Sequence, residues 1–441
     1  MKIMKFGGTS VGRPERMHQV KDLVTSSEEP TIVVLSALSG TTNALTSIGE
    51  ALSSGDKALA KKRIDELHAH YLDFYPKLLS SEAGIQKAKE IVQEHFEFLN
   101  ILLKISFNEA LNLDILAQGE LLSTKLFFTL LEEHGIKANF LSALDFMSID
   151  INGEPELDKI SERLKAILAE YDADQTLFVT QGYICKNHRN EVDNLKRGGS
   201  DYTASLVAAA INASVCEIWT DIDGMHNNDP RIVDRTRPIA ELSFDEAAEL
   251  AYFGAKILHP ASIWPAQQFN IPVRLLNTME PQAHGTLIKA EVPSVGVKAI
   301  AAKDGITAIK IKSSRMLLAY GFLRKVFEIF EKYKTPIDMI TTSEVAVSVT
   351  IDEVGNLSKI IKELEAFGMV EVDSDQAIIC IVGNKIAEDE GTLKSVLDAL
   401  KGIPVRMLSY GGSRHNVSVL VDSKVKKQAL SQLNEGVFVW N

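Results

Sequence analysis

Two glycines, an arginine, a serine and an aspartate crowd in front of an apolar helix in the stretch "NLKRGGSDYTASLVAAAINA", residues 194–213. Arg197, Ser200 and Asp201 are the residues here that could do chemistry. The start of a helix offers unpaired N–H groups and a partial positive charge, which together bind an anion such as a phosphate or a carboxylate. A plain helix cap with two turn glycines explains the same residues. The other motifs of the chain must decide between these two interpretations.

A second glycine-rich loop, "MKFGGTSVG", occupies residues 4–12. Gly7 and Gly8 allow the backbone to approach a phosphate closely, and Lys5 can place its ammonium on the same group. The loop is not a Walker A motif, because its lysine precedes the glycines. A simple turn between a strand and a helix is the alternative.

Two further stretches place polar groups where a small substrate could bind. "SALSGTTN", residues 36–43, offers hydroxyl groups after a strand, although a turn alone explains it equally well. "AQGELLS" places Glu120 inside an otherwise apolar helix, where a lone carboxylate is unusual unless it is paired. We therefore expect a cationic partner for Glu120, either an internal arginine or the ammonium of a ligand.

Two later loops suggest contacts with a nucleotide. "IWTDIDGMHNNDPR", residues 218–231, is rich in Thr, Asp, Asn and Gly but lacks the spacing of an EF-hand, so a nucleotide-binding edge fits it better. "FGAKILHP", residues 253–260, places Lys256 after a glycine, where it could reach a phosphate or remain in solvent.

The elements around these loops predict an α/β fold. Residues 2–6 and 31–37 are strand-like with a helix at 13–26 between them, and the chain is helical in period from about 43 to 133. Strands are predicted at 137–143, 175–184 and 215–224, and a helix is predicted at 201–213. Such alternation predicts a mainly parallel sheet covered on both faces, and ligands bind at the carboxyl ends of its strands.

The composition changes after about residue 290, where "AEVPSVGVKAI" is typical of a linker. Two tandem βαββα units follow, each completed by one more strand, which predicts ferredoxin-like repeats. We therefore expect a catalytic domain over 1–290 and two regulatory domains over 300–372 and 373–441, with strands that interleave between these two.

The bulk composition excludes several classes of partner. The 441 residues carry a net charge of −12, which argues against a nucleic-acid or anionic-membrane surface. No run approaches the roughly 20 apolar residues of a membrane span, and "MKIMKFGGTS" has no signal core. The three cysteines show neither a disulfide framework nor a metal spacing. We expect a cytoplasmic protein.

Taken in order, the motifs "KFGGTSV", "VTQGYI", "RGGSDYTA", "WTDIDG", "DPR" and "FGAKILHP" resemble those of the aspartate kinases in the amino acid kinase family. The tail resembles their paired ACT regulatory domains. The resemblance implies an amino acid kinase-like sandwich followed by two ACT domains, of the lysine-sensitive monofunctional type. It also implies ATP-dependent phosphorylation of the β-carboxylate of L-aspartate, the first step toward lysine, threonine and methionine.

The resemblance assigns roles to individual residues. Lys5 would neutralise the transferring phosphoryl group, and Asp201 would orient Lys5. For binding aspartate it implies Ser36, Thr42, Glu120, Arg197 and Ser200. For binding ATP it implies Lys5, Phe6, Gly7, Gly8, Thr220, Asp221, His226, Arg231 and Lys256. Mg²⁺ would be held mainly by the ATP phosphates, without a dedicated metal site in the protein. Lys196 departs from the family pattern, because it stands where a glycine is usual.

The first ACT unit, "RMLLAYGFLRKVFEIFEKYKTPIDMITTSE", resembles the lysine-binding stretch of lysine-sensitive aspartate kinases. The effector residues it implies are Met316, Ala319, Gly321, Phe322, Leu323, Ile337, Asp338 and Ser343. Asp338 would pair with the ammonium of the effector. ACT units pair their sheets across subunits, so we expect a homodimer or a tetramer. No dinucleotide-binding motif is present, so we expect no fused dehydrogenase.

Two alternatives remain open at the level of the sequence. A relative of the same family could phosphorylate glutamate, carbamate or a nucleoside monophosphate, although Glu120 and Arg197 favour a zwitterionic substrate. From a different class, the chain could be a non-catalytic amino acid sensor. Retention of Lys5 and Asp201 argues against the sensor.

Overall fold

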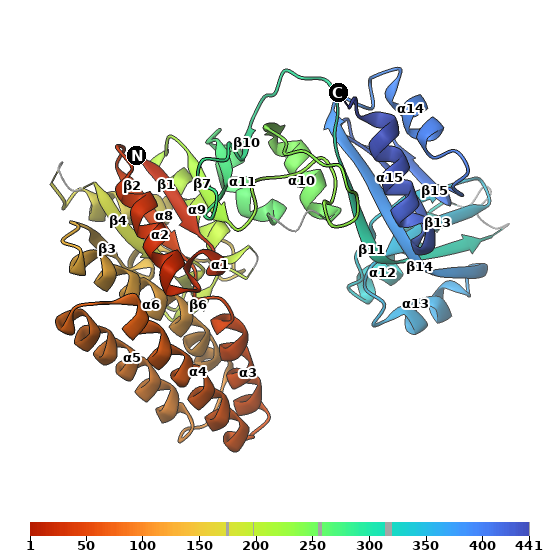
Figure 1. Cartoon of the computed structure of the whole chain (residues 1–441). Coiled ribbons are helices and arrows are strands. Elements are labelled where there is room, and N and C mark those ends of the chain that lie inside the picture. Colours follow the sequence, from red (N-terminus) through yellow and green to blue (C-terminus); the bar gives the residue numbers. More distant parts are fainter. Residues whose placement is uncertain (173–175, 197, 255–257, 314–319, 441) are drawn as a thin grey trace. The chain divides into compact units, whose positions relative to one another are not determined.

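The computed structural model describes residues 1–172, 176–196, 198–254, 258–313 and 320–440 (Figure 1). The chain forms two compact units that interleave along the sequence. The first comprises residues 1–225, 240–244 and 258–291, and the second comprises residues 226–239, 245–257 and 292–441. The domain limits that the sequence suggests stay predictions.

The first unit is built on an eight-stranded sheet in the order β3-β4-β2-β1-β7-β9-β10-β8. Its strands are β1 (Lys2–Phe6), β2 (Thr31–Leu35), β3 (Asn139–Leu141), β4 (Leu177–Gln181), β7 (Cys216–Thr220), β8 (Glu241–Ser243), β9 (Val273–Asn277) and β10 (Thr286–Lys289). The six strands from β3 to β9 are parallel to one another, and β10 runs antiparallel to β9. A short hairpin of β5 (Ile184–Lys186) and β6 (Val192–Asn194) lies apart from this sheet.

Both faces of the sheet are covered, as near-continuous apolar strands require. On one face, alternate residues such as Phe6 and Leu35 enter a core shared with α2 (Pro14–Thr25) and α6 (Glu109–Glu133). The other face is covered by α9 (Gly199–Ile211), which contacts β1, β2 and β7. The same unit also contains the helices α1 (Gly8–Val11), α7 (Ala143–Phe146), α8 (Leu157–Leu168) and α11 (Pro260–Gln268).

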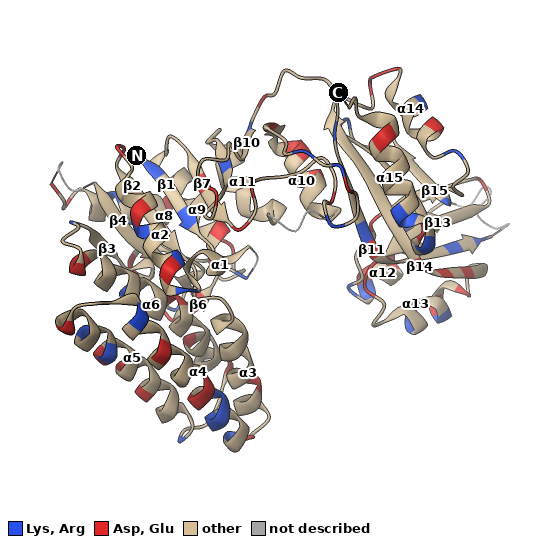
Figure 2. Ribbon diagram, in the orientation of Figure 1, with Lys and Arg blue, Asp and Glu red and all other residues tan. Residues whose placement is uncertain are grey.

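A helical bundle extends from the sheet, formed by α6 with α3 (Thr41–Ser53), α4 (Lys57–Leu78) and α5 (Glu82–Leu102) (Figure 1). Asn108 caps α6, because its side-chain oxygen accepts a hydrogen bond from the Leu111 amide at 2.9 Å. Acidic and basic residues alternate on the outside of α4 (Figure 2) and form ion pairs such as Lys77 with Asp73. The long helical stretch predicted from the sequence is therefore four antiparallel helices, of which α6 carries Glu120.

The second unit contains a six-stranded antiparallel sheet in the order β12-β13-β11-β14-β16-β15. The strands are β11 (Gly296–Lys312), β12 (Ile340–Thr342), β13 (Ala346–Ile351), β14 (Met369–Asn384), β15 (Met407–Tyr410) and β16 (Asn416–Asp422). Four helices, α12 (Phe322–Lys332), α13 (Leu357–Leu364), α14 (Thr392–Ala399) and α15 (Lys426–Val437), pack on the sheet, with the 3-10 turn η1 (Ser423–Val425) before α15. Helix α10 (Phe244–Tyr252) belongs to this unit from Asp245 onward.

Two hydrophobic cores hold the second sheet, one under α12 and α13 and one under α14 and α15. Strands β11 and β14 are long enough to run through both cores and pair with each other along their length. The stretch expected to be a linker is already part of β11 from Gly296, because its backbone groups pair with residues of β14 more than 80 positions away. The predicted fold class, a mainly parallel α/β domain followed by an ACT region, is confirmed.

Among the described residues, no helix combines the length and the apolar character that a membrane span requires.

Candidate active site

The candidate site lies where the parallel strands of the first unit end. Phe6, at the end of β1, pairs in register with Leu35 of β2 and Trp219 of β7, and Leu35 pairs with Gln181 of β4. The loops that follow these strands must therefore emerge side by side at one edge of the sheet. The loop of Gly7, the loop of Ser36 and the turn after Gln181 all lie at this edge.

Lys5 and Asp201 meet at this edge. Lys5 Nζ lies 2.6 Å from Asp201 Oδ1, and the two side chains are only 11% and 17% exposed. Asp201 stands in the first turn of α9, where a helix start stabilises an anion. A Cβ atom added at Gly7 would lie 3.4 Å from Lys5 Nζ, so the glycine loop passes directly beside the ammonium. The structure thus brings together Lys5 and Gly7, predicted to contact phosphate, and Asp201, predicted to orient Lys5.

The serines of two separate motifs are also joined. Ser36 Oγ donates a hydrogen bond to Ser200 Oγ at 2.8 Å, which links the loop after β2 to the start of α9. Gly182 makes this approach possible, because a Cβ atom there would lie 2.4 Å from Ser200 Cβ. Ser123 of α6 donates to the Ser36 carbonyl at 2.7 Å and fixes the same loop from the other side. Arg197, predicted to bind the substrate carboxylate, lies outside the described residues.

Glu120 is the most unusual group at this edge. The residue is 4% exposed, and among the described residues only the Ala37 amide donates to its Oε1, over a long distance of 3.4 Å. No residue in the described part of the chain hydrogen-bonds to Oε2. Burial raises the pKa of this carboxyl to about 8, and the Ala37 amide opposes that rise in part. A buried carboxylate with a free oxygen is costly unless a cationic group completes it.

Two tyrosines near Glu120 were not found by the sequence analysis. Tyr71 is fully buried, and its hydroxyl lies 3.2 Å from Thr41 Oγ1 at the start of α3. Tyr183 has a positive φ of 67°, which is strained for an aromatic residue. Its amide donates to Thr203 Oγ1 of α9 at 2.8 Å, which stabilises that backbone conformation. Burial first, and the charge of Glu120 second, raise the pKa of Tyr183 to about 12.

The other predicted residues of the first unit take different positions. Thr42 is exposed in the first turn of α3. Phe6 is fully buried and stacks on Trp219 with ring centroids 5.8 Å apart, so its ring belongs to the core and is not open to a ligand. Gly8 packs tightly, because a Cβ atom there would lie 3.0 Å from the Ala37 carbonyl oxygen. Thr220 donates to Asp221 Oδ1 at 3.1 Å at the end of β7, and Asp221 is exposed.

Comparisons with known proteins agree with this geometry. Residues 1–277 match the amino acid kinase family, and residues 379–436 match an ACT domain. The chain therefore belongs to the amino acid kinase family. Within this family it is 34% identical over 451 residues to the lysine-sensitive aspartokinase 3 of Escherichia coli (strain K12), covering 99% of each chain. It is 35% identical over 469 residues to the chloroplastic aspartokinase 3 of Arabidopsis thaliana, covering 99% of this chain and 81% of that relative.

Solved structures give the same family. The crystal structure of E. coli aspartokinase III in complex with aspartate and ADP, described as the R-state, matches with a TM-score of 0.82 at 32% identity. The complex of that enzyme with lysine and aspartate, described as the T-state, matches with a TM-score of 0.81 at 32% identity. Each match covers 100% of both chains. The resemblance to aspartate kinases that the motifs carry is confirmed.

Two predicted ATP contacts of this amino acid kinase do not belong to the first compact unit. His226 and Arg231 belong to the second compact unit. The guanidinium of Arg231 is held by Asp229 through contacts of 2.8 and 2.9 Å, and His226 Nδ1 lies 3.3 Å from Thr236 Oγ1. Lys256 lies outside the described residues. Their roles in binding ATP stay predictions.

The predicted effector residues that the structure describes lie at the start of α12 and on either side of the strand β12. Gly321 caps α12 with a left-handed φ of 78°, which a glycine adopts without strain. Phe322 is buried in the core beneath α12, whereas Leu323 is half exposed. Met316 and Ala319 lie outside the described residues.

The remaining effector residues lie before and after β12. Ile337 is half-buried and Ser343 is exposed, with the Ser343 amide donating to the Ala346 carbonyl at 2.8 Å. The side chain of Asp338 is only 1% exposed and contacts Lys303. No local sequence pattern singles out Lys303, because 35 residues separate it from Asp338.

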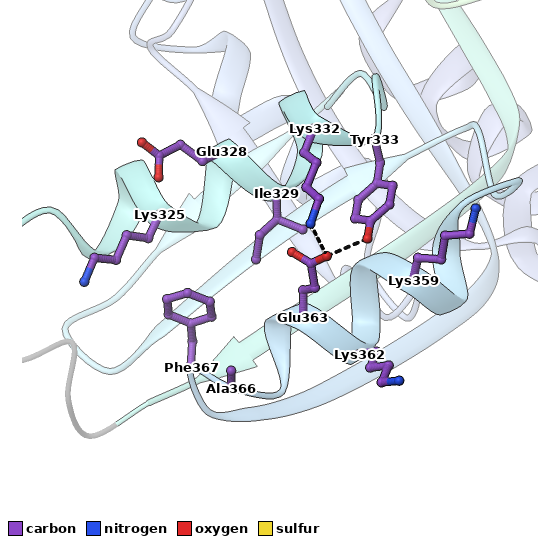
Figure 3. A pocket seen from close by; sticks show the side chains of 10 residues that line it. All are labelled: Lys325, Glu328, Ile329, Lys332, Tyr333, Lys359, Lys362, Glu363, Ala366 and Phe367. Atoms are coloured by element: carbon purple, nitrogen blue, oxygen red, sulfur yellow. Dashed lines mark hydrogen bonds and ion pairs between the residues drawn. The ribbon is translucent and has the colours of Figure 1, made fainter.

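A separate open groove of about 770 Å³ lies between α12 and α13 (Figure 3). Lys332 and the Tyr333 hydroxyl both contact Glu363 there, at 2.6 and 2.5 Å. None of the described residues predicted for catalysis or effector binding lines this groove. We assign it no part in the reaction.

Proposed function

We propose that the chain transfers the γ-phosphoryl group of ATP to the β-carboxylate of L-aspartate, which gives 4-phospho-L-aspartate and ADP. The similarity to aspartokinases over the whole length supports this reaction, as does the fold shared with an enzyme solved with aspartate and ADP. The same resemblance implies a place at the start of lysine, threonine and methionine biosynthesis.

The observation that carries the proposal is the free oxygen of Glu120. Among the described residues, this buried carboxylate has one weak hydrogen-bond partner, the Ala37 amide, so a ligand ammonium would complete its hydrogen bonding and balance its charge. An α-amino acid supplies that ammonium, whereas carbamate and nucleoside monophosphates do not. The Ser36–Ser200 hydrogen bond and Arg197 would hold the remaining polar groups of the amino acid.

The chemistry needs no general base. The β-carboxylate is already ionised at neutral pH, so one of its oxygens attacks the γ-phosphorus directly while the bond to the bridging oxygen of ADP breaks. Both reacting groups are anionic, and catalysis therefore depends on positive charge, N–H donors and alignment. Lys5 supplies the charge, and Asp201 holds its ammonium at the edge of the sheet.

Mg²⁺ would accompany ATP and neutralise part of the phosphate charge. In the described part of the chain, no group of three His, Cys, Asp or Glu side chains is arranged to hold a metal ion. In phosphoryl-transfer sites Mg²⁺ is usually bound by substrate phosphates, waters and one or two carboxylates.

We also propose that L-lysine inhibits the enzyme by binding at the first ACT region, with its side-chain ammonium on Asp338. The E. coli relative is named lysine-sensitive, and its structure has been solved with lysine. A homodimer or tetramer through the ACT regions and a cytoplasmic location complete the proposal. The three cysteines are buried and unpaired, which agrees with a reducing compartment.

The test is ATP-dependent formation of an acyl phosphate, trapped with hydroxylamine as the hydroxamate. We expect product with L-aspartate, little with L-glutamate, and a lower rate when L-lysine is added. Product with glutamate alone would assign the chain to the alternative kinase class. Binding of an amino acid without any product would instead indicate the non-catalytic sensor.

A further inference from the structure

The carboxylate of Asp338 is already engaged by groups of the protein itself. Lys303 Nζ lies 2.7 Å from Asp338 Oδ1, and the Tyr252 hydroxyl donates to the same oxygen at 2.9 Å. Lys303 Nζ also lies 2.8 Å from Asp352 and 4.6 Å from the centre of the Tyr252 ring. Both contacts fall on Oδ1, so an ammonium that binds this oxygen must share or replace them.

The cluster has room and charge for one more cation. Asp338 and Asp352 carry two negative charges against the single positive charge of Lys303. In the described part of the chain, Asp338 Oδ2 has no hydrogen-bond partner, although the side chain is 1% exposed. Asp338 is among the residues that line a cavity of about 300 Å³, together with Glu249 and Tyr252. An ammonium can enter while Lys303 stays on Asp352.

Tyr252 connects this cluster to a motif predicted to bind ATP. It is the last residue of α10 and directly precedes "FGAKILHP", in which Lys256 is the predicted phosphate contact. Gly254 packs against β11 with a left-handed φ of 131°, and an added Cβ atom would lie 2.3 Å from the Ala302 carbonyl oxygen. The beginning of the motif is thus held on β11 at Ala302 and Lys303, two neighbouring residues.

The other end of α10 is held on the same strand. Glu246 is fully buried and lies 3.1 Å from Lys298 Nζ of β11. Glu249 accepts a hydrogen bond at 2.5 Å from Asn416 of β16. Of these anchors, only the one at Tyr252 includes the carboxylate that a cationic effector would bind.

We propose that Tyr252 is the internal competitor of the effector for Asp338, and that its release on effector binding alters the ATP-binding motif that follows it. The inference rests on the proposed inhibition by lysine. Tyr252 is here a positioning residue, since it acts through the segment after α10. Lys303 keeps the carboxylates partly neutralised in both arrangements, through its second contact with Asp352.

The test is Tyr252→Phe in the full chain, which keeps the ring and removes only the hydroxyl. Lysine binding is measured by calorimetry, and the apparent KM for ATP is measured with and without lysine. We expect lysine to bind roughly five-fold more tightly, because the hydrogen bond from Tyr252 to the Asp338 carboxylate no longer has to break. We also expect the KM for ATP to move toward the lysine-bound value without lysine, so that added lysine changes it less.

A matched control is Tyr333→Phe, which removes only a hydroxyl group. This hydroxyl donates a hydrogen bond to Glu363 in the groove between α12 and α13. It should leave both lysine binding and the lysine response unchanged. Suppose that the unmodified enzyme binds lysine, and that Tyr252→Phe binds it with the same affinity or more weakly. Tyr252 then does not compete with the effector, whereas the proposed lysine site is retained. If the unmodified enzyme does not bind lysine, both proposals fail.

Discussion

Lys5 Nζ lies 2.6 Å from Asp201 Oδ1, although 196 positions separate the two residues in the sequence. The pair forms because β1 ends beside the start of α9, and neither side chain is more than 17% exposed. A cation held this way is oriented before the phosphate arrives, and a preorganised charge stabilises a transition state at little reorganisation cost.

Lys5→Met should lower kcat by roughly 10²–10³-fold, the usual effect of removing one preorganised charge donor. Aspartate binding should persist, since Glu120 and the two serines are unchanged. Asp201→Asn should lower kcat by less, because the ammonium remains but loses its orientation. The rates come from the hydroxamate assay, and circular dichroism controls for folding. Equal activity of Lys5→Met and the unmodified enzyme would remove Lys5 from the mechanism.

Glu120 should make aspartate binding release protons near neutral pH. Its pKa of about 8 means that the carboxyl is mostly protonated at pH 7, and the substrate ammonium favours the ionised form. Calorimetry in two buffers of different ionisation enthalpy measures this release directly. Affinity for aspartate should rise with pH up to about 8. Glu120→Gln should bind aspartate more weakly and release no proton, and an unchanged proton release would show that another group titrates.

The same group affects stability. A carboxyl with a raised folded-state pKa binds more protons when folded, so stability falls as pH rises from the unfolded value of 4.5 toward 8. Glu120→Gln should therefore gain stability relative to the parent chain at pH 8 and lose that advantage near pH 5. Thermal unfolding midpoints at these two pH values provide the comparison.

His95 should weaken the helical bundle in acid. Burial lowers the pKa of this histidine, a hydrogen bond with Gln118 opposes the shift, and the charge of Lys125 adds to it. The unfolded chain therefore takes up a proton first as the pH falls below about 6.5, and stability is lost over that range. His95→Gln should flatten the decline of the thermal midpoint between pH 7 and 5. His188→Gln, at an exposed position, should leave it unchanged.

Much of the site could be predicted from the sequence because its chemistry sits in short loops after strands. In a parallel sheet these loops share one edge, which predicts a ligand site there, and the resemblance to aspartate kinases assigned Lys5, Ser36 and Ser200 to that site. Glu120 was recognised by contrast, since an acidic residue inside an apolar helix needs a partner. Both the loops after strands and the isolated Glu120 can be recognised from the residues immediately around them.

Contacts between residues that are distant in sequence could not be predicted from local composition. Tyr252 and Asp338 are 86 positions apart, and neither position departs from the local pattern around it. The full length of β11 was missed for a similar reason, because its first residues are stabilised by β14 and look like a linker when considered alone. Pairing between segments that are remote in sequence depends on the assembled fold, which local propensity does not describe.

Gly182 offers the sharpest test of the geometry at the sheet edge. A Cβ atom at this position would lie 2.4 Å from both Cβ and Oγ of Ser200, so Gly182→Ala must push the start of α9 away from Ser36. A displacement of about 1 Å at a catalytic edge costs up to roughly 100-fold in rate. We expect kcat/KM for aspartate to fall at least about 10-fold.

The matched control is Gly355→Ala, since a Cβ atom at Gly355 would meet nothing within 4 Å. That variant should retain the parent rate and thermal midpoint. If Gly182→Ala also retained the parent kcat/KM, the start of α9 would have to accommodate the methyl group without moving the Ser36–Ser200 contact. That contact would then be incidental to catalysis, and the alignment of the substrate would depend on Glu120 and Arg197 alone.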